Sequence, residues 1–233
     1  MYKLKLTILF ILCFSINALS NNSINNSVVI DKKNNNTPTV KNIAYDAQQA
    51  IRLKHLEVGI KILKDGMQTL GNNQYLMQNL ALAYYMNKMY KKSSAIYAEL
   101  LQKNPKDESM LNNYMISLSA NSQGDAINTI NNLWNLYPRS HIIPAQLGIL
   151  YSQMNNIVQA IYSYTAAIKI EPRIDYKYNL AILLDKTGEK TAALMMYKDI
   201  ISYFANGIAS NKTYNIPIDA IRNRINSLNK NAS

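Results

Sequence analysis

The side chains that most often carry catalysis are few in this sequence and lie far apart. The two histidines, His55 and His141, belong to different parts of the chain, and the single cysteine, Cys13, stands near its start. The carboxylates are dispersed, no serine stands in a nucleophile-elbow motif, and no glycine-rich loop could hold a phosphate. No spacing matches a metal site. The sequence therefore predicts no catalytic residue, metal or cofactor, and both histidines are expected to be surface residues near helix-connecting turns.

The first residues have the composition of an export signal. Lys3 and Lys5 precede an apolar run, and Ala18-Leu19-Ser20 offers small residues at the positions that a signal peptidase recognises. The apolar run is shorter than the roughly 20 residues that a membrane-spanning helix needs. We therefore expect residues 1–20 to be a cleaved signal peptide, with a retained membrane anchor as the alternative. The protein is then exported, periplasmic or secreted, and its mature chain has no transmembrane segment.

Cys13 raises a second alternative, lipid attachment, but the bulky Leu12 before it is unlike the small residue of a lipoprotein signal. If cleavage follows Ser20, the mature chain has no thiol, which excludes disulfides and thiolate metal sites. Residues 21–39 are rich in Asn, Ser and Lys and hold little apolar surface. Such a segment cannot offset its ordering entropy, so we expect a disordered leader.

The charge of the chain is strongly positive, at +11, and removal of Lys3 and Lys5 would leave +9. Acidic residues are interspersed among the basic ones, only short pairs such as Lys32-Lys33 and Lys91-Lys92 cluster, and no nucleic-acid-binding motif accompanies them. A solvated basic surface is the simpler interpretation. Binding to a polyanion or to an anionic envelope surface is the alternative.

A repeat organises the rest of the chain. Pro105, Pro138 and Pro172 follow one another at 33 and 34 residues, and each comes after a stretch with helical apolar spacing. Ahead of Pro172, small and aromatic residues alternate on two successive apolar stripes: Leu147, Gly148 and Tyr151, then Ala160, Tyr164 and Ala167. Small residues let paired helices approach closely, tyrosines fill the space between pairs, and proline ends the second helix.

This pattern resembles the tetratricopeptide repeat, a helix-turn-helix unit of about 34 residues. The resemblance implies an all-α solenoid of about five repeats, at residues 40–73, 74–107, 108–140, 141–173 and 174–207. The third repeat needs one deletion in the loop around Gly124. Residues 208–233 are expected to form a linker and a capping helix, because Ile218, Ile221, Ile225 and Leu228 recur at helical spacing after Pro217.

The resemblance also implies a binding face. In this family the sixth residue of each repeat points into a concave groove, and here Tyr45 is followed by a carboxamide in four repeats: Asn79, Asn113, Gln146 and Asn179. A carboxamide both donates and accepts, so it can pair with any peptide backbone. Four residues would flank this track: Tyr75, Gln78, Asn112 and Tyr178. Asparagine is common at this repeat position, so a ladder without a ligand is the alternative.

The expected function is that of a non-enzymatic interaction scaffold or adaptor of the cell envelope, with a protein or peptide as its partner. The family's clamp for a C-terminal carboxylate is not reproduced, because Gln78, Leu82, Asn112 and Ile116 occupy comparable positions. We therefore expect an extended internal segment to bind, and no specific nucleic acid. Polyanion binding is the second hypothesis, and weak self-association through uncapped repeat ends is the third.

Overall fold

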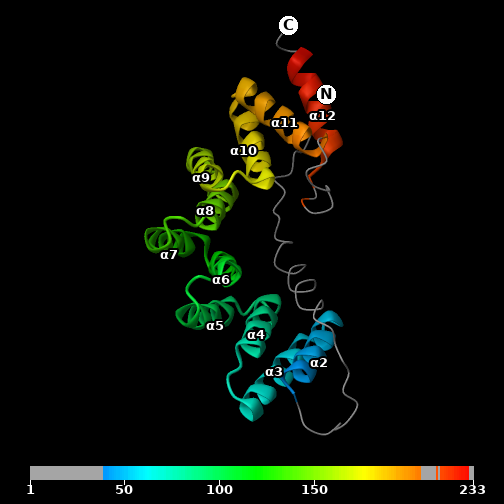
Figure 1. Cartoon of the computed structure of the whole chain (residues 1–233), viewed down its shortest axis with the longest axis vertical. Helices are drawn as coiled ribbons and strands as arrows, with labels where there is room; N and C mark the ends of the chain where they lie inside the picture. Colours follow the sequence, from blue (N-terminus) through cyan, green and yellow to red (C-terminus); the bar gives the residue numbers. More distant parts are fainter. Residues whose placement is uncertain (1–38, 206–213, 215, 231–233) are drawn as a thin grey trace. The chain divides into compact units, whose positions relative to one another are not determined.

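A computed structural model describes residues 39–205, 214 and 216–230 of the chain. All regular structure in this part is α-helical, in 11 helices (Figure 1). The predicted signal peptide and residues 21–38 of the predicted leader lie outside the described residues, as does most of the linker that precedes the last helix. The all-α solenoid expected from the sequence is confirmed.

The described chain divides into two compact units, one up to Asn128 and one from Thr129. The first unit contains α2 (Val40–Arg52), α3 (Leu56–Leu70), α4 (Gln74–Met86), α5 (Tyr90–Lys103) and α6 (Glu108–Asn121). The boundary lies within α7 (Gln123–Leu136). The second unit continues with α8 (Ile142–Gln153), α9 (Ile157–Ile170), α10 (Ile174–Thr187), α11 (Lys190–Ala205) and α12 (Ile218–Lys230).

Each of the five predicted repeats holds two of these helices, and consecutive helices pack against each other from α2 to α6 and from α8 to α12 (Figure 1). Polar side chains fix several helix starts, because they satisfy backbone N–H groups that have no partner within the helix. The Asn73 side chain accepts from the amide of Tyr75 at 2.9 Å, and Asp107 accepts from that of Met110 at 2.9 Å.

The turn between the two helices of a repeat recurs with the same backbone. The fifteenth residue is left-handed in four repeats, with φ values of 64° at Lys54, 60° at Lys88, 58° at Asn155 and 90° at Gly188. In the third repeat the corresponding residue, Ser122, is extended, with φ −160°. One residue joins α6 to α7 there. The deletion expected around Gly124 therefore falls at the turn itself, and Gly124 lies inside α7.

Small residues allow close helix contact, as the sequence predicts. A Cβ at Gly148 would lie 2.9 Å from two ring carbons of Tyr164, and a Cβ at Gly66 would lie 2.5 Å from Ile43. Both distances are too short for real carbon atoms. The core of each unit is therefore built on direct contact between a helix backbone and a large side chain of the facing helix.

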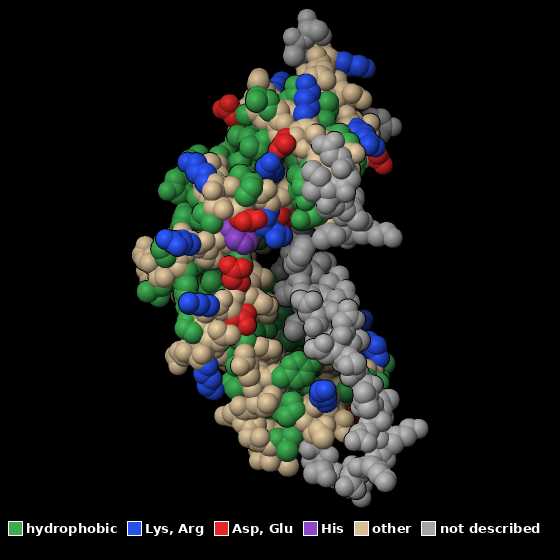
Figure 2. All heavy atoms as spheres, viewed as in Figure 1, with side chains coloured by type: hydrophobic (Ala, Val, Ile, Leu, Met, Phe, Trp, Pro, Cys, Tyr) green, Lys and Arg blue, Asp and Glu red, His purple; other side chains and the backbone are tan. Residues whose placement is uncertain are grey.

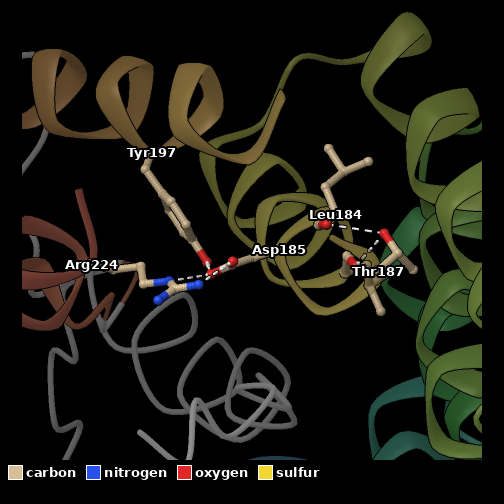
Figure 3. A network of polar contacts seen from close by, with 6 residues as sticks. Leu184, Asp185, Thr187, Tyr197 and Arg224 are labelled. Carbon is tan, nitrogen blue, oxygen red and sulfur yellow. Dashed lines mark hydrogen bonds and ion pairs between the residues drawn. The ribbon is translucent and has the colours of Figure 1, made fainter. Parts of the chain in front are cut away.

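The last helix closes the second unit. Ile221 and Leu228 of α12 are buried in one cluster with Ile182 of α10 and Tyr197 and Ile200 of α11. A polar contact accompanies this packing (Figure 3): Arg224 donates to both carboxylate oxygens of Asp185, at 2.7 and 2.6 Å, and the Tyr197 hydroxyl donates to the same carboxylate at 3.4 Å. Three helices thus meet at one carboxylate whose side chain is only 9% exposed.

Candidate functional site

Polar side chains join the first helices of the first two repeats. Gln48 of α2 donates through Nε2 to Asn79 Oδ1 at 2.8 Å and lies 3.4 Å from the Tyr75 hydroxyl. Asn79 in turn donates through Nδ2 to the Tyr75 carbonyl at 2.8 Å. We call Gln48, Tyr75 and Asn79 the carboxamide cluster. Its members hold one another in fixed orientations, so a ligand would meet an ordered polar surface.

Helix geometry explains why these residues share one face. Tyr75 and Asn79 are four residues apart on α4, and residues at this spacing are neighbours on a helix surface. Besides its own partner α3, α2 packs directly against α4, and no contact of that extent joins α3 to α5. In the first two repeats, the first helices therefore lie closer together than the second helices do. Tyr45 stands one turn before Gln48, and 61% of its surface is exposed.

The predicted carboxamides fall into two pairs, with Asn79 and Asn113 in the first unit and Gln146 and Asn179 in the second. Asn79, Gln146 and Asn179 are buried, with 4%, 7% and 8% of their surface exposed, whereas Asn113 is half-buried. The Asn79 amide already has partners on both its oxygen and its nitrogen. Within each pair these side chains contribute to packing, and their role toward a ligand stays a prediction.

Two of the carboxamides lie against a buried tyrosine of the preceding repeat. Burial raises the pKa of Tyr97, and a polar contact with Asn113 partly opposes this rise. Burial likewise raises the pKa of Tyr164, and the nearby Asp175 carboxylate adds to the rise. Asn179 stands beside Tyr164, and a polar contact with it partly opposes this rise in pKa.

The pairing of a tyrosine with the carboxamide of the next repeat has a signal in the sequence that the repeat pattern alone does not include. Tyr97 precedes Asn113, and Tyr164 precedes Asn179, at nearly the same spacing. Aliphatic residues, Leu63 and Ile130, occupy the tyrosine position ahead of Asn79 and Gln146. At Asn79, Gln48 takes the place of the tyrosine as the partner of the carboxamide. Gln48 carries no signal of its own in the sequence, because its contact with Asn79 joins residues of different repeats.

The flanking residues differ in their access to solvent. Tyr75, Gln78 and Asn112 are half-buried on α4 and α6 of the first unit. Tyr178, by contrast, is only 1% exposed and belongs to the core cluster that includes Tyr197 and Ile221. Burial raises its pKa to about 12. The accessible part of the predicted track therefore lies in the first unit.

A second polar cluster occupies the starts of α8 and α10. Arg173 forms two hydrogen bonds of 3.1 Å with the Asp175 carboxylate, and its guanidinium lies 5.2 Å from the centre of the Tyr176 ring. The Tyr176 hydroxyl is 2.8 Å from Nδ1 of His141. His141 is therefore half-buried and hydrogen-bonded, in contrast to the plain surface residue expected, whereas His55 is exposed. The charges in this cluster are mutually satisfied.

Neither cluster has the composition of a catalytic or metal centre. In residues 39–205, 214 and 216–230, no group of three or more His, Cys, Asp or Glu side chains could hold a metal ion. No helix in the same ranges is long and apolar enough to cross a membrane. On the face that Figure 2 shows, Lys and Arg side chains are scattered among acidic, polar and apolar ones. Such a mixed surface does not favour a polyanion track.

Known proteins share this fold. A tetratricopeptide-repeat-containing protein of Methanocaldococcus jannaschii is 26% identical over 183 residues, a match that covers 73% of this chain and 31% of that relative. The chain thus spans about a third of the relative's length. No protein-family profile matches the chain.

Solved structures of tetratricopeptide-repeat proteins have the same fold as this chain. MamA of Desulfovibrio magneticus RS-1 superposes with a TM-score of 0.53 at 14% identity, over 71% of this chain and 95% of that one. A thermophilic tetratricopeptide-repeat protein of Thermus thermophilus gives 0.51 at 14% identity, over 81% and 97%. One from Parabacteroides merdae gives 0.55 at 16% identity, over 81% and 71%. The predicted tetratricopeptide-repeat fold is confirmed.

Proposed function

We propose that this chain is a non-enzymatic interaction scaffold whose first unit binds an extended polypeptide segment across α2, α4 and α6. The carboxamide cluster is the observation that carries this proposal. It places the exposed carboxamide of Gln48, which Asn79 and Tyr75 hold in position, near the exposed ring of Tyr45, so backbone recognition and an aromatic anchor lie together. Aromatic residues on an accessible face often supply much of the binding energy of an interface.

The spacing of the helices suits an extended segment. Neighbouring helices lie about 8–10 Å apart, and an extended chain rises about 3.3 Å per residue. Polar groups on successive first helices could therefore meet roughly every third residue of a bound peptide. Because hydrogen bonds within the cluster fix Gln48, Tyr75 and Asn79 before binding, less side-chain entropy is lost when the peptide docks.

The proposal includes a location in the cell envelope. Its support is the sequence of residues 1–20, with Lys3 and Lys5 before a short apolar run and small residues at Ala18 and Ser20. Intact-mass measurement of the native protein tests this part. A mature chain that begins after Ser20 supports it, and an exported chain that retains Met1 contradicts cleavage.

Site-specific photo-crosslinking tests the binding face. A benzoylphenylalanine replaces either Tyr45 on α2 or Tyr162 on α9, a matched control because both are exposed tyrosines, at 61% and 64%, but Tyr162 lies on the second helix of its repeat. In cells, we expect the Tyr45 position to crosslink one reproducible polypeptide and the Tyr162 position not to. Equal labelling at both positions, or only nucleic acid at Tyr45, would contradict the proposal.

A further inference from the structure

An open groove runs between α11 and α12. The groove has a volume of about 370 Å³ and is lined by Lys198, Ile201, Arg222, Ile225 and Asn226. All five residues belong to the second unit. Neither the repeat signature nor the carboxamide cluster accounts for this surface, because α12 forms one side of it.

Helix α12 presents different residues to the core and to this groove. Arg224 turns inward to Asp185 (Figure 3), and Arg222 lies two residues away, about 200° around the helix axis. The Arg222 side chain is accordingly 61% exposed. Arg224 holds the helix in place, whereas Arg222 is available at the surface.

Both helices bring the same pair of side chains to the groove. On α11 Lys198 is followed three residues later by Ile201, and on α12 Arg222 is followed three residues later by Ile225. Residues at this spacing lie on one helix face, so each helix contributes a cation beside an aliphatic side chain. Ile201 and Ile225 pack on the core cluster and form the apolar part of the lining.

The cations in the groove are weakly neutralised. Within the described part of the chain Lys198 forms no ion pair, and its neighbour Asp199 bonds to Lys177 at 2.5 Å. Among the described residues, Arg222 pairs only with Asp219, at 3.2 Å, and the Asp219 side chain is 93% exposed. An exposed pair of this kind contributes about 0–1 kcal/mol, so a carboxylate from another molecule can replace Asp219 at little cost.

We propose that this groove is a second docking surface, which binds an acidic segment of a partner polypeptide with an aliphatic residue between two carboxylates. The carboxylates pair with Lys198 and Arg222, and the aliphatic side chain covers Ile201 and Ile225. Arg222 can hold a carboxylate with two parallel hydrogen bonds, and Asn226 can donate to or accept from the peptide backbone. The apolar lining distinguishes this ligand from a bare anion such as phosphate.

A labelled peptide tests the proposal with the mature chain. The probe is a fluorescein-labelled peptide with the sequence Gly-Asp-Leu-Glu-Leu-Asp-Gly, and its control carries Asn and Gln in place of the acids. We expect fluorescence anisotropy to show binding of the acidic peptide, and at least tenfold weaker binding, about 1.4 kcal/mol, after the double substitution K198E/R222E. The matched control K61E/K190E changes the net charge equally but lies outside the groove, and we expect it to bind within about twofold of the parent.

Three results would overturn the proposal. One is equal weakening by K61E/K190E, which would show that total charge alone attracts the peptide. Another is equal binding of the control peptide that carries Asn and Gln in place of the acids. The third is binding of the chain to phosphatidylglycerol vesicles, lost in K198E/R222E, without binding of the acidic peptide, which would assign the groove to a lipid surface. Circular dichroism melting of each variant confirms that it is folded.

Discussion

The contact between Arg224 and Asp185 predicts that one substitution releases α12 while the rest of the chain stays folded. The Asp185 carboxylate is only 9% exposed and receives two short hydrogen bonds from Arg224. Loss of one member of a buried charge pair costs about 3–5 kcal/mol. Because the Arg224 side chain is 28% exposed, water will partly replace it, and we expect about 2–3 kcal/mol for Arg224→Met.

Amide hydrogen exchange measures this effect at the right place. In a repeat protein each helix depends mainly on its neighbours, so the loss should be confined to α12 and the adjoining part of α11. Since about 1.4 kcal/mol corresponds to tenfold, we expect protection in α12 to fall roughly 30- to 150-fold. Protection in α2–α5 should not change, because these helices belong to the other unit.

Two further variants test whether the Arg224–Asp185 contact holds α12 in place. Arg222→Met removes a cation from the same helix, but its pair with Asp219 is exposed, and we expect less than about a fivefold change. Asp185→Asn added to Arg224→Met removes the unpaired carboxylate and should restore part of the protection. Unchanged protection of α12 in Arg224→Met, or the same loss in Arg222→Met, would refute the role assigned to this contact.

Three other predictions concern the core and the carboxamides. Gly148→Ala should lower the free energy of unfolding by about 1–3 kcal/mol in urea titrations, since its Cβ would meet the Tyr164 ring, whereas a Cβ at Gly124 would meet nothing beyond the adjacent backbone within 4 Å, so Gly124→Ala should be neutral or stabilising. Buried tyrosines have raised pKa values, about 12 for Tyr178, so their contribution to stability is complete below pH 10.0, their ordinary pKa, and is lost as pH rises through 12. Tyrosinate absorbance and circular dichroism should then change together in one alkaline step, and gradual ionisation with full helicity retained would contradict this. Replacing Asn79 and Asn113, the two predicted carboxamides of the first unit, together by alanine should retain helicity and weaken binding of the crosslinked partner at least about tenfold, and unchanged affinity would dismiss these carboxamides as a ligand site.

The repeat was predictable from local signals. Prolines at a fixed spacing, glycine and alanine at close helix contacts, and tyrosines between helix pairs each have a direct physical meaning within one repeat. The second helix of the fourth repeat shows this well: Ala160, Tyr164 and Ala167 were expected on one apolar stripe, and all three are buried.

The contacts between distant residues were not predictable. Arg224 and Asp185 are 39 positions apart, and Gln48 and Asn79 are 31 positions apart. Nothing in the spacing of one sequence marks such pairs, because each depends on how one helix rotates against another. Tyr178 shows the same limit. The resemblance to the repeat family implies a place beside the groove, but packing against α11 and α12 buries this side chain.

The left-handed residue in the turn between the two helices of a repeat affects which end of the chain unfolds first under force. Gly188 adopts this backbone freely and asparagine, as at Asn155, tolerates it, whereas Lys54 and Lys88 hold it at a cost of about 1–2 kcal/mol each. Both lysines lie in the first unit. A pulling force or a translocating motor would therefore find its weaker turns there, and exchanging Lys54 and Lys88 for glycine, with Gly188 for lysine, would bias the order of unravelling toward the opposite end.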